Sequence, residues 1–308
     1  MKKYFLLLLF GLLFGCEKPF EYSITDIPTF EPLAKPLPGK GYQVHVPPFP
    51  IPYNFEREIF VRMPLDNPDF IYVNGFETKM REGTHHLILY GLENYNDKFA
   101  PPVGKIRDQN TSDGHLNIWS QMADNKWYFE SPTANYNFKL PEGYAIRMPA
   151  KVNFDVNSHY YNYTEKIRFG EVYANLYTIP KAEVKQVIRN KSYDWNDEIV
   201  LSPKKTTIIE KTRMFSKPTY FLSITSHTHK RGKHFQMYYV GGQKDGQLFY
   251  DSDNYSHPLN LDFEVPLAFK KNEGIKAVVT FENDTVRTIK GGVTSEDEML
   301  MVITKLYD

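Results

Sequence analysis

Two histidines separated by a single residue, His227 and His229, are the side chains in this chain best placed to do chemistry. They end an alternating run, residues 221–229, that predicts a β-strand leading into a turn at Gly232. Residues two apart on a strand share a face, so both imidazoles point the same way and can bind one metal ion. The same pattern also fits two solvent-facing histidines on an exposed strand.

Further candidate ligands lie elsewhere in the chain. His85 and His86 are adjacent, His159 stands alone, and Met299 ends an acidic run. A regular strand would turn His85 and His86 to opposite faces, so joint ligation requires a bulge or a strand end there. Met299 also fits a core role, and Met301 would share its strand face. Imidazole nitrogens and a thioether sulfur are all potential ligands of a transition-metal ion.

Short β-strands are the elements that would position these residues. Residues 145–161 alternate, with apolar side chains on one face and polar ones, including Asn157 and His159, on the other. His159 is therefore expected to face away from the hydrophobic core, with Asn157 as its hydrogen-bond partner. No long stretch has a helical period, and 15% of residues are aromatic, so an all-β body is predicted.

The N-terminal residues are typical of a bacterial lipoprotein. Lys2 and Lys3 precede an apolar run at residues 4–14, which is too short to span a bilayer comfortably. Gly15 then precedes Cys16, the single cysteine, and this resembles a lipobox. The resemblance implies a signal peptide over residues 1–15, lipid on Cys16, and an outer-membrane address in the cell envelope, on the periplasmic or the surface-exposed face. An uncleaved anchor, or a plain signal peptide with a stray cysteine, is the alternative.

The rest of the chain divides into a tether and two domains. Residues 16–53 contain nine prolines and are predicted to be an extended tether, although Tyr42 and Val44 could pack part of it onto the first domain. The boundary between the two domains is placed at Ile179-Pro180, which gives domains over residues 54–179 and 180–308. Formal net charge is zero and there is no basic block, so nucleic acid is not an expected partner.

Taken together and in this order, the candidate ligands resemble those of the copper type II, ascorbate-dependent monooxygenases, the family of peptidylglycine α-hydroxylating and dopamine β-monooxygenases. The resemblance rests on residues 84–91, Thr-His-His-Leu-Ile-Leu-Tyr-Gly, on the His227 and His229 pair, and on residues 294–299, Thr-Ser-Glu-Asp-Glu-Met. It implies two tandem antiparallel β-sandwich domains, jelly-roll-like, with a cleft between them.

The resemblance also implies a ligand set and an activity. The first domain would hold one copper ion through His85, His86 and His159. The second would hold another through His227, His229 and Met299. Ascorbate or another reductant would reduce both ions, and dioxygen bound in the second domain would hydroxylate an activated C–H bond of a small-molecule or peptide substrate.

The chain departs from the family at the substrate anchors. Peptide-amidating members carry an arginine where Thr225 stands, and an asparagine and a tyrosine at the positions of Met301 and Ile303. Glycine-extended peptides are therefore not expected substrates. An alternative function is a non-catalytic lipoprotein subunit of an outer-membrane complex with a structural or vestigial copper site, and another is copper handling without turnover. Four other histidines are expected at the surface: His45, His115, His234 and His257.

Overall fold

The computed structural model describes residues 27–92, 100–108, 126–131, 133–292 and 296–308, without the side chain of His85. Residues 32–308 form one compact unit, and residues 1–31 form a separate one. Of the smaller unit the structure describes residues 27–31, which contain no strand or helix. Within these described ranges, no helix has the length and apolar character needed to cross a bilayer.

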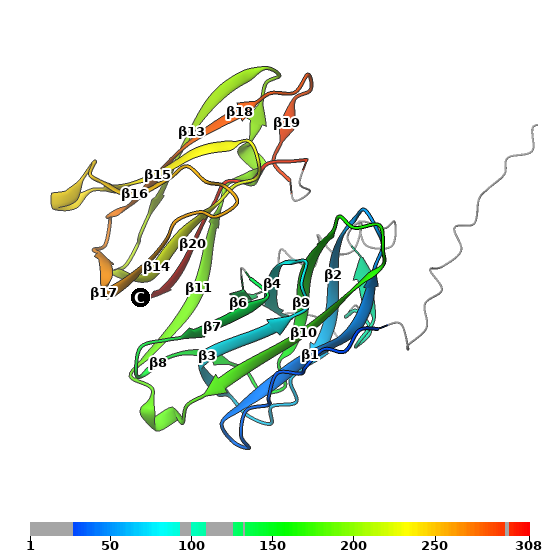
Figure 1. Ribbon diagram of the computed structural model, residues 1–308. Coiled ribbons are helices and arrows are strands. Elements are labelled where there is room, and N and C mark those ends of the chain that lie inside the picture. The colour runs from blue at the N-terminus through cyan, green and yellow to red at the C-terminus, as the bar shows by residue number, and fades with distance from the viewer. Residues whose placement is uncertain (1–26, 93–99, 109–125, 132, 293–295) are drawn as a thin grey trace, which may run out of the picture. The chain divides into compact units, whose positions relative to one another are not determined.

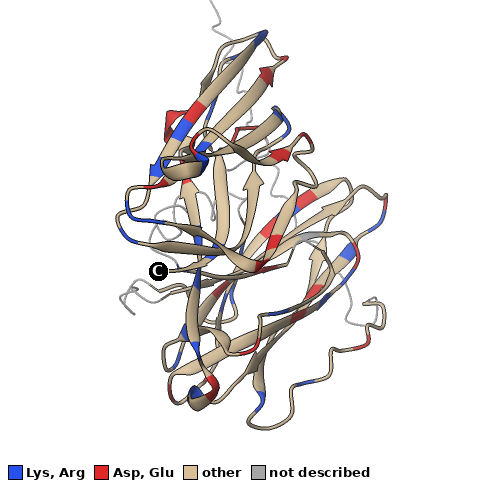
Figure 2. Cartoon of the chain, turned by 90° about the vertical axis from the view of Figure 1, so that its left-hand side faces the viewer, with Lys and Arg blue, Asp and Glu red and all other residues tan. Residues whose placement is uncertain are grey.

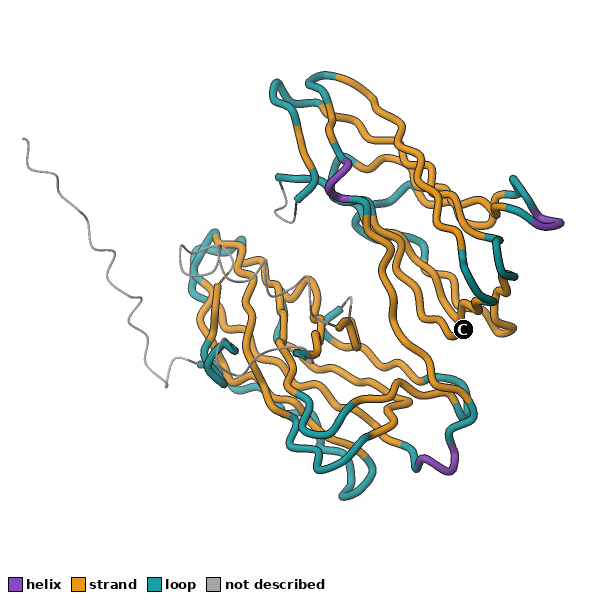
Figure 3. Tube along the Cα trace, turned by 180° about the vertical axis from the view of Figure 1, so that it is seen from behind, coloured by secondary structure: helices purple, strands orange, loops and turns teal. Residues whose placement is uncertain are grey.

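The larger unit is all-β, as the sequence predicts, and its only described helices are three short 3-10 turns (Figures 1 and 3). The described residues of the first lobe form ten strands: β1 (Gly41–Ile51), β2 (Phe55–Pro64), β3 (Ile71–Met80), β4 (Thr84–Gly91), β5 (Ile106–Asp108), β6 (Lys126–Ser131), β7 (Asn135–Lys139), β8 (Tyr144–Met148), β9 (Asn153–Asn162) and β10 (Arg168–Thr178). The second lobe contains the rest: η2 (Lys181–Glu183), β11 (Gln186–Asp194), η3 (Asn196–Glu198), β12 (Val200–Leu201), β13 (Lys205–Met214), β14 (Thr219–His227), β15 (Gly232–Val240), η4 (Gly242–Lys244), β16 (Leu248–Ser252), β17 (Asn260–Phe269), β18 (Gly274–Asn283), β19 (Ile289–Lys290) and β20 (Met301–Tyr307).

Each lobe is a β-sandwich. In the first lobe, a sheet in the order β5-β2-β9-β4-β6 faces the strands β1-β10-β3-β8, and one apolar cluster that includes Phe76, Phe154 and Val156 lies between them. In the second lobe, the sheet β13-β18-β15-β16 and the strands β11-β20-β14-β17 enclose a cluster that includes Phe221 and Phe281. The pairs are antiparallel apart from β8 with β11, which is parallel and continues one nine-stranded sheet through both lobes.

The expected tether is too long, because residues 41–51 form strand β1 and pair with β10. Val44, Val46, Phe49 and Ile51 are buried in the first core, which gives this segment more apolar burial than a solvated tether can have. The register shifts between Val46 and Phe49, where two prolines without N–H groups stand, and β1 lies at the edge of its sheet, where prolines are tolerated.

The two lobes repeat one structural frame, which the sequence analysis does not detect. In the first lobe, Asn162 is buried and donates from Nδ2 to the carbonyls of Ile51, Pro52 and Lys166, at 2.8–3.0 Å. Its Oδ1 accepts from the backbone and hydroxyl of Thr164.

Asn283 in the second lobe makes the same contacts. It donates to the carbonyls of Leu201, Ser202 and Arg287 at 2.8–3.1 Å and accepts from Thr285. Both asparagines end a strand, and both bind the connection between two earlier strands, β1 and β2 in the first lobe and β12 and β13 in the second.

The strand registers extend this correspondence. Ile51 lies opposite Arg168 in β1 and β10, and Leu201 lies opposite Ile289 in β12 and β19. The counterpart of the continuous strand β10 is therefore β19 followed by β20, interrupted by residues 291–300. Met299 belongs to this interruption. The acidic run is therefore an insertion in the second lobe, and the first lobe has the same arrangement of strands without it.

Candidate functional site

His227 and His229 lie close together at the end of β14, although the sequence predicts both on the strand and His229 comes two residues after it. His227 is the last residue of the strand, and the two imidazole ring centres are 5.4 Å apart with an interplanar angle of 89°. Both side chains are partly exposed, whereas Ser226 and Thr228, which alternate with them, are buried. The two histidines therefore share one face of the chain.

A neighbouring backbone carbonyl defines the tautomer of His229. Its Nδ1 lies 3.2 Å from the carbonyl oxygen of Asp297, an atom that only accepts hydrogen bonds, so Nδ1 carries the proton and Nε2 is free to bind a metal. Burial lowers the pKa of this imidazole, and the Asp297 carbonyl opposes that effect in part. A neutral ring with a free Nε2 is the form that binds a metal ion.

Glu298 connects this histidine segment to the acidic run. Its carboxylate is fully buried and accepts three backbone N–H groups, from His229, from Arg231 at 3.0 Å and from Met299 at 2.9 Å. Burial raises the pKa of Glu298, and these N–H donors oppose the increase. One carboxylate thus holds the backbones of His229 and Met299 next to each other, which gives a physical reason for a glutamate directly before the methionine.

A second acidic side chain of this segment, that of Glu296, is neutralised by neighbouring cations. Glu296 pairs with Lys230, with Arg231 at 3.5 Å and with Arg287 at 3.1 Å. Figure 2 shows this pattern on a larger scale, with acidic and basic residues interspersed along the strands. Thr294 and Ser295 of the acidic run lie outside the described residues.

Two methionines lie near the histidine pair. Met299 precedes β20 and is partly buried, whereas Met301 lies directly opposite His227 in the β14–β20 register. Directly opposed residues have Cβ atoms about 4.5–5.5 Å apart, so Met301 is a second thioether within reach of the site. The prediction that Met299 is the ligand stays a prediction.

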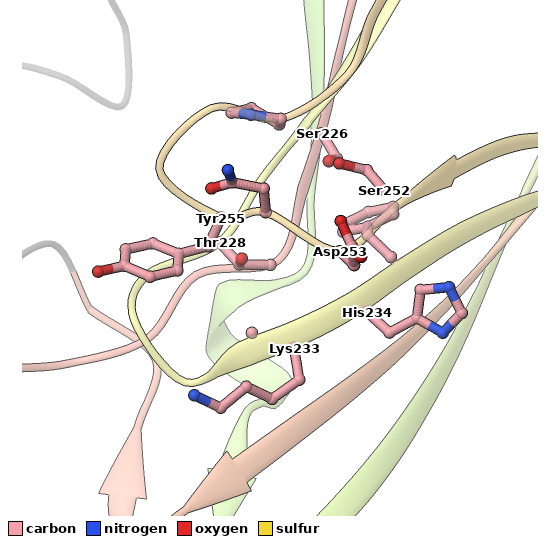
Figure 4. Close-up of a pocket in the computed structure, with 11 residues that line it drawn as sticks. Ser226, Thr228, Lys233, His234, Ser252, Asp253 and Tyr255 are labelled. Atoms are coloured by element: carbon pink, nitrogen blue, oxygen red, sulfur yellow. The ribbon is translucent and has the colours of Figure 1, made fainter.

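A small hollow lies on the other side of this segment and is not part of the histidine site. It has a volume of about 10 Å³, which is room for a single water molecule, and is lined by Ser226, Thr228, His234 and Asp253 among others. In Figure 4, Ser226, Thr228 and Asp253 border this hollow. Because Ser226 and Thr228 line it, the alternating residues His227 and His229 face away from it.

The first-lobe candidates meet on three adjacent strands. Glu58 of β2, His159 of β9 and His86 of β4 form one cross-strand row, in which each residue lies opposite the next. The ring centres of His86 and His159 are 5.1 Å apart. The register between β4 and β9 shifts between Thr84 and His86, so the irregularity that joint ligation by His85 and His86 requires is present at that point.

His159 lies on the polar face of β9, as the alternation predicts, but it is only 7% exposed. It is covered by other polar and aromatic groups: its Nε2 lies 2.8 Å from Glu56 Oε1, and its ring centre lies 4.7 Å from that of Tyr161. Asn157 bonds a different histidine from the predicted one. Its Oδ1 lies 3.1 Å from Nε2 of His86, while its Nδ2 donates to Glu58 Oε1 at 3.0 Å.

Glu56 and Glu58 are site residues that the sequence analysis misses. The signal is present in residues 55–60, Phe-Glu-Arg-Glu-Ile-Phe, where a two-residue period puts both glutamates on one face. Burial raises the pKa of Glu58, against the opposing effects of His159 and Asn157. Since Glu56 and Asn157 accept from Nε2, these contacts favour the tautomers of His159 and His86 that are protonated at Nε2.

The ring spacing of both histidine pairs fits a shared metal ion. Metal–nitrogen bonds of about 2.0–2.1 Å in a tetrahedral site put two imidazole centres roughly 5 Å apart, close to the observed 5.1 and 5.4 Å. Nevertheless, the described part of the chain contains no group of three or more His, Cys, Asp or Glu side chains that could hold a metal ion. A third ligand in each lobe would come from His85, whose side chain is not described, and from a methionine.

The remaining sequence candidates lie apart from these clusters or outside the described residues. Cys16 and His115 fall outside them. His45 lies 3.1 Å from Glu171, the partly exposed His234 lies 2.5 Å from Asp251, and His257 is exposed. Thr225, at the position of the family's arginine anchor, donates its hydroxyl to the carbonyl of Leu259.

No family model matches the chain, and no curated protein matches it. Among solved structures, the chain is similar to the STIV MCP, at 8% identity and a TM-score of 0.35 over 87% of this chain and 97% of that one. It is also similar to the Sputnik virophage structure, at 7% identity and a TM-score of 0.27 over 94% of this chain and 90% of that one. At such TM-scores these likenesses carry no argument about function.

Proposed function

We propose that this chain is a copper-dependent monooxygenase of the ascorbate-dependent type, tethered to the bacterial envelope, that hydroxylates an activated C–H bond. The observation that supports this most directly is the second-lobe arrangement. One buried carboxylate, Glu298, draws the backbones of His229 and Met299 together, and the Asp297 carbonyl leaves Nε2 of His229 free. A soft thioether beside two imidazoles suits copper better than zinc or magnesium.

The residues of each lobe have distinct roles in this proposal. His227, His229 and Met299 would hold the copper at which dioxygen is used, and His86 and His159, with His85, would hold the copper that passes on an electron. Copper would supply one-electron chemistry and a binding position for dioxygen. Asn157, Glu56 and the carbonyl of Asp297 orient the imidazoles and fix their tautomers, and Glu298 holds the backbone of His229.

The decisive experiment counts copper ions per chain in the full-length protein and in three variants. We expect two equivalents in the parent and about one in His159→Ala and in His229→Ala. His234→Ala is the matched control, because it removes a partly exposed histidine outside both clusters, and it should keep two equivalents. A parent chain that takes up no specific copper contradicts the proposal and leaves the non-catalytic subunit as the surviving alternative.

The choice between the two methionines can be tested in the same preparations. X-ray absorption of the Cu(I) form should show a sulfur neighbour that is lost in Met299→Leu and kept in Met301→Leu. The reverse result would assign the ligand to Met301, which lies opposite His227.

The envelope location is a separate part of the proposal and rests on the residues around Cys16. Mass spectrometry of the chain from its bacterial host should find lipid on Cys16 and no residues before it. A Cys16→Ser variant should lose both the lipid and the membrane fraction, and an unlipidated parent would contradict this part alone.

A further inference from the structure

A cavity of about 450 Å³ is lined by no residue of either histidine cluster, and no part of the proposed function uses it. It is lined mainly by β11, by the turn between β13 and β14, and by Asp308. Thr219, at the start of β14, lines it, whereas His227 ends that nine-residue strand. At about 3.3 Å per residue, the two ends of β14 are roughly 25 Å apart. The volume is in the range of pockets that bind small molecules.

The lining of this cavity is strongly cationic. Five basic side chains line it against the single carboxylate of Asp308. The basic residues are Lys126, Arg189, Lys191, Arg213 and Lys217. This excess is local, because the whole chain has a formal net charge of zero. A concave surface of one charge concentrates ligands of the opposite charge.

Asp308 shows how this surface holds a carboxylate. The guanidinium of Arg189 donates hydrogen bonds to both of its oxygens, at 2.7 and 2.5 Å, and Nζ of Lys217 lies 2.9 Å from Oδ2. This is the two-point geometry in which guanidinium groups bind carboxylates and phosphates. The Arg189 hydrogen bonds are the main reason that the pKa of Asp308 falls to about 2.

Two of the cations remain available. Neither Lys191 nor Arg213 forms an ion pair with a carboxylate among the residues that the structure describes. Arg213 lies over the ring of Tyr193 with its guanidinium carbon 5.2 Å from the ring centre, which holds its charge at the cavity wall.

The wall of the cavity also contains polar atoms without partners. Nε1 of Trp127 and Oδ1 of Asn190 are buried and have no hydrogen-bond partner within the described part of the chain. The amide of Asn190 is held in place, since its Nδ2 donates to the carbonyl of Tyr128 at 2.9 Å. Buried polar atoms without partners cost stability, and this cost is localised in the wall of the cavity.

We propose that this cavity is a binding site for a small polyanion, a molecule with at least two carboxylate or phosphate groups. One group would bind Lys191 and Arg213, and a second would share Arg189 and Lys217 with Asp308. The aromatic surface of Trp127 and Tyr193 would cover the body of the ligand. The site is independent of the proposed copper chemistry.

Isothermal titration of the metal-free full chain tests this proposal, with pyrophosphate and citrate as probes at constant ionic strength. We expect saturable binding of at least one probe to one site. Arg213→Gln and Lys191→Gln should each weaken it at least fivefold. Lys271→Gln, which removes an exposed lysine outside the cavity, should leave it unchanged. Binding of pyrophosphate alone would indicate a phosphorylated ligand, and binding of citrate alone a polycarboxylate.

Asp308→Asn gives a test with the opposite sign. Removing the carboxylate frees Arg189 and Lys217, so this variant should bind the preferred probe several-fold more tightly. The proposal is overturned if neither probe binds saturably, if Lys271→Gln weakens binding as much as Arg213→Gln, or if Asp308→Asn binds no more tightly than the parent.

Discussion

The two lobes have the same frame and place their histidine clusters at different corners of it. In the first lobe, His86 lies opposite His159 across β4 and β9. At the matching place in the second lobe, His234 lies opposite Thr280 across β15 and β18, and the histidine pairs with Asp251 instead. One histidine at an equivalent position therefore does not make a cluster, because the cross-strand partner decides whether two imidazoles meet.

At the turn after β14, the second lobe has its histidine cluster, and the equivalent turn of the first lobe, as the structure describes it, has none. The turn after β14 carries His229 and is held to the inserted residues by Glu298. The corresponding turn after β3 in the first lobe has no insertion to bind. Arg81 there pairs with Glu171 of the uninterrupted β10, at 2.8 Å, and His45 lies 3.1 Å from the same carboxylate. Equivalent turns of the two lobes can therefore hold different clusters, an ion-pair cluster in the first lobe and a candidate metal site in the second.

The shared frame itself can be broken at its asparagines, and this should have the largest effect. Asn162→Ala and Asn283→Ala each leave three carbonyls without their side-chain donor in a buried turn. We expect each to lower the free energy of unfolding by about 2–4 kcal/mol. Urea titration measures this, with exposed Asn137→Ala as the control. If only one of the two variants is destabilised, the frames are not equivalent.

In the second lobe, the buried carboxylate of Glu298 holds the backbones of His229 and Met299 together, and Glu298→Gln tests this role. An amide keeps one acceptor oxygen and turns an NH₂ group toward backbone N–H donors, so we expect copper affinity in that lobe to fall about 10–100-fold. The measurement is competition with a chelator in the His159→Ala background, where the second-lobe copper is the one expected to remain. Exposed Glu296→Gln is the control. Equal losses in both variants would contradict a specific role for the buried carboxylate.

The smallest expected effect concerns acid unfolding of the second lobe. The pKa of Asp308 falls from its ordinary 3.8 to about 2, chiefly through Arg189. Its contribution to stability is therefore present above pH 4 and is lost as the pH falls from about 4 through 2. Asp308→Asn should lower the free energy of unfolding at pH 7 by about 1 kcal/mol, since the pair is partly screened by solvent. It should also flatten the decline between pH 4 and 2, which denaturation at a series of pH values would detect; an unchanged slope would contradict this assignment.

By itself the sequence determined the all-β class, the shared face of His227 and His229, and the polar face of His159. These follow from a two-residue period, which is a local property of an extended chain. The repeated asparagine turns were also readable, as Asn-Tyr-Thr-Glu-Lys at residues 162–166 and Asn-Asp-Thr-Val-Arg at residues 283–287. With only two positions identical, they did not stand out as a repeat.

Only the tertiary structure decided which side chains meet across strands. Strand register places Glu56 and Glu58 beside the first-lobe histidines. It also pairs Asn157 with His86 and puts Met301 opposite His227. It also drew residues 41–51 into the first sheet, because their apolar side chains gain more by burial than a proline-rich segment gains by remaining solvated. Register depends on the packing of a whole face at once, and no local pattern contains that information.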